Sequence, residues 1–245
     1  MRRLSILVSW TRTLCFSAVT AMGVYLPFDV FAVTLTTSDG PVAVSNWGYR
    51  LQGSSAEGGE LLPNPLAAAT HHLLVMDFAR YGDEGSKFTT QEVSDIKNSA
   101  PSRGGNGARK VVAAYVSIGE ASEFRSYWDP AWTVGGNASD PLAPGAPSWL
   151  GPVNPDWPES RKVRYWEPGW QDIIYGSVTA WLDQVVAQGF DAAYLDIVDA
   201  YYFWAVELDA GDRLPADPAA ITHNAEKRQC SPIFENIIRR TCTPE

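Results

Sequence analysis

Four short apolar runs along the chain predict the strands of a sheet. Two runs of mixed apolar and aromatic residues occupy positions 46–53 (NWGYRLQG) and 71–80 (HHLLVMDFAR). A third, nearly unbroken apolar run follows at 110–118 (KVVAAYVSI), and a fourth begins the segment 189–204 (GFDAAYLDIVDAYYFW). Unbroken apolar runs of this length are typical of parallel strands that are covered on both faces.

Helical patterns separate these strands. The strongest covers residues 170–186, where apolar side chains recur three and four positions apart, and Gly189 follows as a C-terminal stop. A weaker signal covers residues 89–97, with Thr89 or Thr90 as the N-terminal cap. Strands that alternate with helices through short connections predict an α/β fold with a parallel sheet and helices outside it.

The fourth strand directs acidic and aromatic side chains to one face. Alternate residues of a strand share a face, so Tyr194 and Asp196 lie on one side and the apolar Leu195 and Ile197 on the other. We expect the apolar side to pack against the helices. Asp196 then points to the interior of a barrel, near the carboxyl end of its strand, where barrel enzymes place catalytic groups.

Carboxylates follow three of the four predicted strands. Asp77 ends the second, Glu120 lies just beyond the third, and Asp196 ends the fourth. Carboxylates gathered at one rim suit a general acid and a nucleophile or base, because repulsion and partial burial separate their pKa values. The alternative for each acid is a salt bridge to one of three nearby arginines, Arg80, Arg125 or Arg164.

A long segment rich in proline and tryptophan lies between residues 123 and 162. It contains seven prolines and four tryptophans. A connection of this length inside a compact domain is unusual unless it builds a site or a lid. The other interpretation is a satellite hydrophobic cluster that covers one end of a barrel.

Composition narrows the range of partners. The formal net charge is −9 and no basic run occurs, which argues against nucleic acid and against anionic membranes as partners, whereas a cationic ligand would be attracted. Only three histidines occur, with neither a CxxC pair nor an HExxH motif, so we expect no metal site. Cys230 and Cys242 could pair in an oxidising compartment or stay free.

The N-terminus resembles a signal peptide. Residues 1–32 carry early arginines, a short apolar stretch and the sequence VFA before position 33. The apolar stretch is too short to span a bilayer, so we expect cleavage, a secreted or periplasmic protein, and no stable membrane insertion.

A serine-hydrolase interpretation competes with the carboxylate one. Residues 115–119 (YVSIG) nearly match a nucleophile elbow, and Ser117, Asp199 and His223 occur in the chain order of an α/β-hydrolase triad. Tyr115 departs from this motif, because the strained turn of an elbow needs a small residue two positions before the serine.

Four blocks in order resemble one known family. YVSIGEASEFRSYW, PSWLGPVNPDWP, VRYWEPGWQDII and GFDAAYLDIVDAYYFW are similar to sequential blocks of glycoside hydrolase family 114, the endo-α-1,4-polygalactosaminidase family. NWGYRLQG and HLLVMDF resemble its first two strands. The resemblance implies a (β/α)₈ TIM barrel that cleaves α-1,4-linked galactosamine polymers and needs no metal or organic cofactor. Unacetylated galactosamine is cationic, which fits an acidic enzyme.

The resemblance also implies roles for individual residues. Asp196 and Glu120 are the expected catalytic carboxylates, one protonating the departing sugar oxygen while the other attacks the anomeric carbon or activates water. We expect the substrate-binding groups to be Asp77, Asp199, Tyr49, Tyr115, Arg125, Tyr165 and Trp166. For the aromatic residues, ordinary core packing is the alternative.

The resemblance stops at Trp204. We therefore divide the chain into a signal peptide (1–32), the N-terminal part of a TIM barrel (33–204) with about the first four β/α units, and an atypical C-terminal tail (205–245). An incomplete barrel leaves open sheet edges, through which the chain could self-associate. It also raises a second functional class, a catalytically inactive remnant that binds carbohydrate.

Overall fold

The computed structural model of this chain describes residues 5–8, 32–209, 211–215 and 217. Most of the predicted signal peptide and of the predicted C-terminal tail lies outside the described residues, as do His223, Cys230 and Cys242. In the part that is described, no helix is long and apolar enough to cross a membrane.

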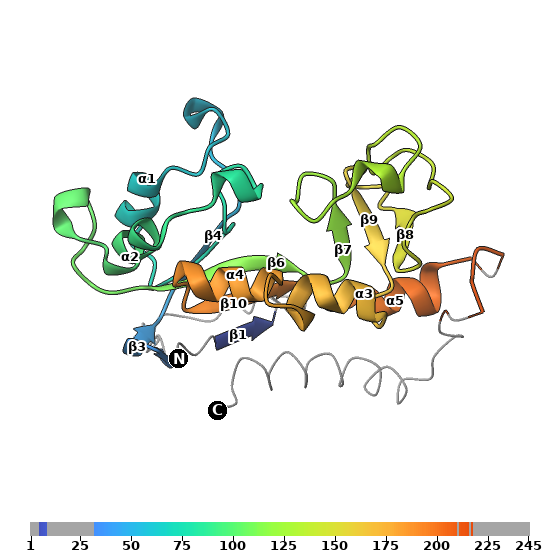
Figure 1. Cartoon of the computed structure of the whole chain (residues 1–245). Coiled ribbons are helices and arrows are strands. Elements are labelled where there is room, and N and C mark those ends of the chain that lie inside the picture. Colours follow the sequence, from blue (N-terminus) through green and yellow to red (C-terminus); the bar gives the residue numbers. More distant parts are fainter. Residues whose placement is uncertain (1–4, 9–31, 210, 216, 218–245) are drawn as a thin grey trace, which may run out of the picture.

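One sheet of parallel strands organises the molecule (Figure 1). The spatial order is β1-β10-β6-β5-β4, and every pair is parallel. Its strands are β1 (Ser5–Val8), β4 (Trp47–Arg50), β5 (Leu73–Met76), β6 (Val111–Ser117) and β10 (Ala192–Asp196). The last four lie side by side in chain order, as consecutive strands of a (β/α)₈ barrel do.

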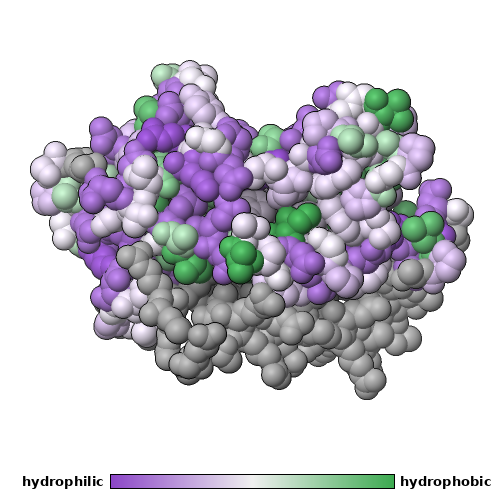
Figure 2. Space-filling model, in the orientation of Figure 1, coloured by the Kyte–Doolittle hydropathy of each residue, from purple (hydrophilic) through white to green (hydrophobic). Residues whose placement is uncertain are grey.

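This arrangement confirms the predicted fold class and all four predicted strands. Among the described strands β1 and β4 form the two edges and do not pair with each other, so the sheet is open. β1 lies within the predicted signal peptide, and cleavage there would leave β10 as the edge strand. Self-association through these edges stays a prediction. In Figure 2 the surface is hollowed between the part that carries α1 and α2 and the part that carries β7 to β9.

Helices and short turns connect the strands. The α-helices are α1 (Pro63–Ala68), α2 (Thr90–Asn98), α3 (Pro168–Gln171), α4 (Trp181–Gln188) and α5 (Ala200–Tyr202); two π-helices are η5 (Asp172–Gly176) and η6 (Phe203–Glu207). The 3₁₀ turns are η1 (Ser55–Glu57), η2 (Glu84–Ser86), η3 (Pro101–Arg103) and η4 (Pro130–Trp132). Helix α2 begins as predicted, because Thr89 and Glu92 form a reciprocal capping box.

The two faces of the sheet differ as the alternation predicted. Ala193 and Leu195 of β10 belong to the main core together with Trp181, Leu182 and Val185 of α4. We call this helix-covered side the outer face. The opposite side, here called the inner face, carries a separate small cluster made of Val75, Ala113, Ala192, Leu73, Tyr115 and Tyr194.

The single helix predicted over residues 170–186 is wrong. The structure divides it into α3, η5 and α4, with a non-helical bend and turn at residues 177–180. Ser177 donates a hydrogen bond to the carbonyl of Asp172, and Gln184 donates one to the carbonyl of Thr179. Such side-chain bonds compete with helical backbone bonds. Val178, counted in the apolar stripe, is 95 % exposed, whereas Gly189 ends α4 as predicted.

The proline- and tryptophan-rich segment, together with the residues that flank it, forms a small antiparallel sheet of order β7-β9-β8. Its strands are β7 (Glu120–Ser122), β8 (Leu150–Val153) and β9 (Ser160–Val163), and a separate hairpin pairs β2 (Val33–Thr37) with β3 (Gly40–Val44). The rings of Trp128, Trp132, Trp149 and Trp170 follow one another at 5.0–5.4 Å between centroids. The segment therefore supplies a hydrophobic cluster, but this cluster is continuous with the main core and not a separate satellite, and Trp157 stays exposed.

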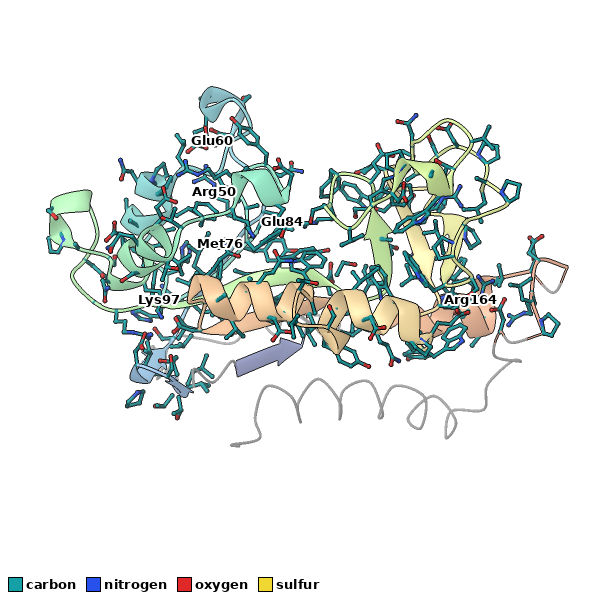
Figure 3. The ribbon with its side chains drawn as sticks, viewed as in Figure 1. Arg50, Glu60, Met76, Glu84, Lys97 and Arg164 are labelled. Atoms are coloured by element: carbon teal, nitrogen blue, oxygen red, sulfur yellow. The ribbon has the colours of Figure 1, made fainter. Side chains whose placement is uncertain are left out.

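Two ion clusters lie at opposite ends of the molecule (Figure 3). At one end the Nζ atom of Lys97 lies 2.9 Å from the fully buried Asp191 and 2.7 Å from Asp39. At the other end the guanidinium of Arg164 binds the carboxylate of Asp217. These pairs join segments far apart in the sequence, so they fix how the helices and loops sit against the sheet.

Lys110 holds the C-terminal end of α1. Its buried Nζ donates to the carbonyls of Leu66, Ala67 and Ala69 at 2.6–3.1 Å. We expect Lys110→Met to lower the free energy of unfolding by about 2–3 kcal/mol at neutral pH, because these carbonyls lose a charged donor. Urea unfolding measures this loss, and an unchanged midpoint would show that the contacts contribute little.

The same lysine gives a pH dependence. Burial lowers the pKa of Lys110 from 10.5 to about 8. Between these pH values the unfolded chain binds more protons than the folded protein, so this group makes stability rise with pH there. The stability difference between the natural chain and Lys110→Met is therefore expected to grow across this range.

Candidate active site

Asp196 lies where the sequence predicted it, on the inner face at the carboxyl end of β10. The hydroxyl of Tyr115, from the neighbouring strand β6, donates a hydrogen bond of 2.8 Å to its Oδ2 atom. In the strand register Asp196 is opposite Ser117, and Tyr194 is opposite Tyr115. The acid is only half-buried, so part of the residue stays accessible to solvent.

Three tyrosines surround this carboxylate on the inner face. The ring of Tyr49 lies edge-on to those of Tyr115 and Tyr194, at 6.4 and 5.6 Å between centroids. Burial, followed by the negative charge of Asp196, raises the pKa values of Tyr49 and Tyr115 well above the usual range. Both phenols therefore keep their protons; Tyr115 donates a hydrogen bond to Asp196, while Tyr49, 47 % exposed, offers part of its ring to solvent.

Asp77 and Arg125 form a buried ion pair. The two guanidinium NH₂ groups donate to the two oxygens of Asp77 at 3.0 and 2.7 Å, and Arg125 also donates to the carbonyl of Gly82. Asp77 additionally accepts from the backbone of Ala79. The salt bridge considered as the alternative is thus what the structure shows, and neither group is open to a sugar in this arrangement.

The pair still lies within electrostatic reach of the inner face. The charge of Asp77 contributes to the raised pKa of Tyr49, and the charge of Arg125 acts on that of Tyr115. The structure therefore brings together five of the predicted residues at one end of the sheet: Asp196, Tyr49, Tyr115, Asp77 and Arg125.

Glu120 has different surroundings. It is buried at the start of β7, where its Oε1 atom accepts from the amide of Asn154 at 2.8 Å and from the ammonium of Lys162. These partners come from the antiparallel sheet, whereas the partner of Asp196 comes from β6. Among the described residues, no hydrogen bond links the two predicted catalytic acids, and Glu120 already has a compensating charge.

The remaining predicted residues lie outside the group around Asp196. Tyr165 is buried, with its ring 5.0 Å from that of Trp166, which in turn lies 5.5 Å from Trp204. These rings pack against the main core, as the packing alternative held. Asp199 is exposed at the start of α5.

The structure does not support the serine-hydrolase interpretation. A nucleophile elbow places its serine on a sharp turn from strand to helix. Ser117 is instead the last residue of β6, and the chain continues after Gly119 into strand β7. Its hydroxyl has no hydrogen-bond partner among the described residues, and His223 lies outside them.

A strained backbone follows Asp196. Ile197 has a φ of 56°, which is unfavourable for a β-branched residue, and strain of this kind persists only where neighbours enforce it. The backbone of Gly119 packs directly against this residue: a Cβ atom at Gly119 would lie 2.5 Å from both the carbonyl oxygen and the side chain of Ile197. The missing side chain of Gly119 thus allows the loop after β10 to close over the end of β6.

We expect Gly119→Ala to displace this loop and to lower kcat about tenfold, with a loss of stability of about 1–3 kcal/mol. The matched control is Gly145→Ala, because a Cβ atom at Gly145 meets nothing within 4 Å. Equal kcat values for the two variants would show that Gly119 does not position Asp196.

The bond from Tyr115 to Asp196 is open to a separate test. Tyr115→Phe keeps the ring and removes only the donor, so we expect a kcat about tenfold to a hundredfold lower, as for loss of a hydrogen bond to a charged group. KM should change little, since the ring remains. A higher KM with an unchanged kcat in Tyr115→Phe would contradict this role.

Comparison with known proteins places the chain in a family. The family model of glycoside-hydrolase family GH114 matches residues 85–225, which is more than half of the chain. The chain belongs to glycoside-hydrolase family GH114. The match includes Glu120, Arg125 and Asp196 and confirms the resemblance of the four sequence blocks between residues 115 and 204. It continues to residue 225, so the expectation that the resemblance stops at Trp204 is wrong.

Curated relatives of this GH114 chain are uncharacterized proteins. One from Methanocaldococcus jannaschii is 33 % identical over 65 % of this chain and 37 % of its own length. One from Deinococcus radiodurans is 36 % identical, over 65 % and 42 % respectively, and one from Thermotoga maritima 28 %, over 79 % and 46 %. The chain thus spans less than half the length of these relatives.

Two solved structures resemble the fold of this chain, each with a TM-score below 0.5. The glycoside hydrolase domain of PelA from Pseudomonas aeruginosa has a TM-score of 0.47 and 14 % identity, with 80 % of this chain and 56 % of that chain covered. Aspergillus fumigatus Ega3, in complex with galactosamine, has a TM-score of 0.42 and 16 % identity, with 80 % and 54 % covered. The family assignment rests on the sequence match alone.

Sequence reasoning left three site residues without a role, and it considered Ser117 only as a serine nucleophile, which the structure does not support. Tyr194 shares the face of Asp196, so the strand alternation could have added it to the aromatic set. Ser117 is opposite Asp196 in the register, which depends on strand pairing. Lys162 and Asn154, which bind Glu120, lie in the segment interpreted as a lid or cluster. The short alternation of β9 was the only available signal for them.

Proposed function

We propose that this chain carries a sugar-binding and catalytic face of a glycoside hydrolase, with Asp196 as its principal catalytic carboxylate. The observation that carries the proposal is the position of Asp196 on the inner face, bonded by Tyr115 and flanked by tyrosine rings. A carboxylate between aromatic rings and hydroxyl donors can contact both the polar edge and the apolar face of a sugar.

The proposed chemistry assigns a task to each group. Glycoside hydrolysis uses one carboxyl group that protonates the departing oxygen and one that attacks the anomeric carbon or activates water. Tyr115 fixes one oxygen of Asp196 and leaves Oδ1 without a hydrogen-bond donor among the described residues. Oδ1 is therefore the atom that we assign to the reacting sugar. Glu120 stays a predicted second acid, one that Lys162 and Asn154 would first have to release.

We propose an α-1,4-linked galactosamine polymer as the substrate. Membership in GH114 and the resemblance to the polygalactosaminidase blocks support this choice. A formal net charge of −9 adds to it, because the field of an acidic protein concentrates a cationic polymer. Export on the signal-like residues 1–32 belongs to the same proposal.

The test is reducing-end release by the purified chain from polygalactosamine and from its fully N-acetylated form. We expect release from the unacetylated polymer, falling as salt is added, because screening weakens attraction between charges of opposite sign. Faster release from the acetylated polymer would overturn the proposed substrate but not the hydrolase. Absence of release from either would overturn the proposed activity.

A second candidate function is binding without hydrolysis. The pairing of Glu120 with Lys162 favours it, because a carboxylate that is held in an ion pair is poorly suited to proton transfer. Co-sedimentation of the chain with the polymer, in the absence of reducing-end release, would support this candidate. Binding together with release would exclude it.

A further inference from the structure

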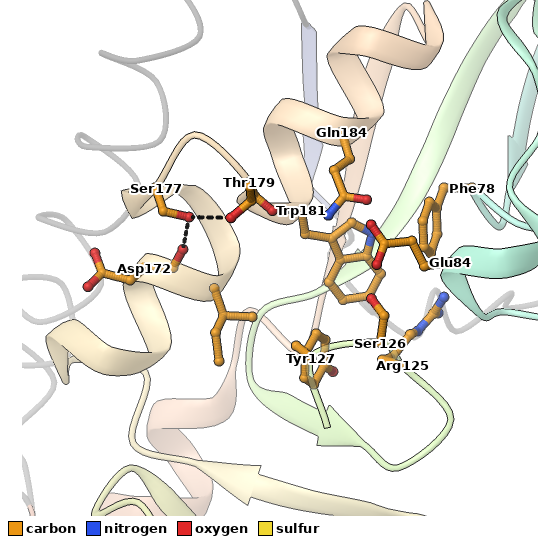
Figure 4. Close-up of a pocket in the computed structure, with 11 residues that line it drawn as sticks. Phe78, Glu84, Arg125, Ser126, Tyr127, Asp172, Ser177, Thr179, Trp181 and Gln184 are labelled. Carbon is orange, nitrogen blue, oxygen red and sulfur yellow. Dashed lines mark hydrogen bonds between the residues drawn. The ribbon is translucent and has the colours of Figure 1, made fainter. Parts of the chain in front are cut away.

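A pocket of about 470 Å³ lies beside Trp181 and Gln184 of α4, the helix that covers the outer face (Figure 4). It lies between η2, the loop after β7 and the break between η5 and α4. Its volume is in the range of sites for small ligands. The break that sequence periodicity did not predict thus forms one wall of this outer pocket.

The lining of the outer pocket combines hydrogen-bonding groups with rings. Its polar groups include the hydroxyls of Ser126, Ser177 and Thr179, the amide of Gln184 and the carboxylate of Glu84. Its apolar part includes Phe78, Tyr127 and Ile173. Several weak polar groups set around an apolar base are suited to a ligand with many hydroxyls and a carbon skeleton, which describes a sugar.

A buried donor in the outer pocket has no partner. Trp181 is 4 % exposed, and its Nε1 atom has no hydrogen-bond acceptor among the described residues. Arg125, Phe78 and Tyr127 pack around the ring at 4.6–5.8 Å. Its buried Nε1 atom lies on the side of the ring nearest Glu84 and Gln184 (Figure 4). Buried donors are rarely left unpaired, so this one calls for a ligand acceptor.

The charges of the outer pocket exclude an anionic ligand. Arg125 lines it, but its guanidinium is already bound on two sides by Asp77. Hydrogen bonds, first from Ser126 and then from Lys87, lower the pKa of Glu84, so this side chain is charged at neutral pH. The carboxylate of Glu84 now pairs with Lys87. The ammonium group of a ligand could take the place of Lys87, and the carboxylate would stay paired.

We propose that the outer pocket is a second carbohydrate site that binds one amino-sugar unit. An oxygen of the sugar accepts the N–H of Trp181, and its ammonium group pairs with Glu84. The choice of an amino sugar rests on the proposed function, whereas the existence of the site rests on the pocket and the unpaired indole. A site on the outer face would hold a polymer chain to the protein without occupying the inner face.

The test is an NMR titration of the Asp196→Asn protein with galactosamine, followed at the indole N–H resonances. The resonance of Trp181 is assigned from its absence in Trp181→Phe or, should that variant not fold, by through-bond assignment. We expect it to shift with saturation, and the affinity to fall about tenfold in Glu84→Gln, which loses a charged hydrogen bond. Asp95→Asn on α2 is the matched control and should leave the affinity unchanged.

The outcomes separate this site from the proposed function. A fixed Trp181 resonance in a protein that hydrolyses polygalactosamine would overturn the second site and leave the function intact. A saturable shift in a protein without hydrolysis would uphold the site and overturn the function. Equal shifts with galactose and galactosamine, unaffected by Glu84→Gln, would contradict the pairing of the ammonium group with Glu84.

Discussion

Replacing Asp196 by Asn should lower the rate of reducing-end release at least about a thousandfold, within the range contributed by a catalytic proton-transfer group. Asn has the same shape and its oxygen can still accept the hydrogen bond from Tyr115, so the fold should persist. What it lacks is the charge that attacks the anomeric carbon or takes a proton from water. Steady-state kcat on a soluble galactosamine oligomer is the measurement.

The matched control for this prediction is Asp95→Asn. Asp95 is an acid of the outer helix α2, bonded by Gln91, and the substitution changes the net charge by the same amount. We expect its kcat to equal that of the natural chain. A tenfold or smaller loss in Asp196→Asn, with Asp95→Asn unchanged, would show that another group carries the chemistry.

Replacing Asp77 by Asn should destabilise the protein by about 3–5 kcal/mol, because it leaves the buried guanidinium of Arg125 without a counter-charge. Both side chains are at least nine-tenths buried, and their bond is bidentate. Arg125→Met should cost a similar amount for the converse reason. Urea unfolding of both variants measures these losses.

The double variant separates the ion pair from a role in sugar binding. When both charges are removed no unpaired ion remains, so the double variant should be more stable than the sum of the two single losses predicts. Were Asp77 a sugar ligand, as the sequence suggested, its loss would raise KM and leave the unfolding midpoint unchanged. That result would contradict the structural role assigned here.

The strand part of the fold was predictable because its signals are local. The run over residues 110–118 is nearly unbroken in apolar residues, which is typical of a strand covered on both faces, and it contains β6. In β10 the alternation of Tyr194 and Asp196 with Leu195 gave the correct face for each. The position of Asp196 on the inner face followed from that alternation alone.

Features that depend on contacts between distant segments were not predictable. Asp191 is fully buried and paired with Lys97 and Arg109. In the sequence it simply follows a glycine and a phenylalanine, and nothing in that pattern predicts its burial or its partners. The pairing of Asp77 with Arg125 joins residues 48 positions apart, so three arginines stood as equal alternatives.

Side-chain hydrogen bonds to the backbone explain why the helix predicted from hydrophobic periodicity is interrupted in the structure. Residues 170–186 satisfy a helical stripe, but Ser177 and Gln184 bond to backbone carbonyls and open the helix at residues 177–180. Hydrophobic spacing does not record such bonds. The strands β7, β8 and β9 are three or four residues long, and proline and glycine interrupt β8, so their alternation was too short to recognise.

The most direct test of the inner face as the sugar-binding surface is an NMR titration of tyrosine ring signals. The Asp196→Asn protein with labelled tyrosines would be titrated with a galactosamine oligomer. We expect the ring signals of Tyr49, Tyr115 and Tyr194 to shift together with one saturation curve, while that of Tyr81, exposed in the loop after β5, stays fixed. Saturable binding of the oligomer with these three signals unmoved would contradict the account.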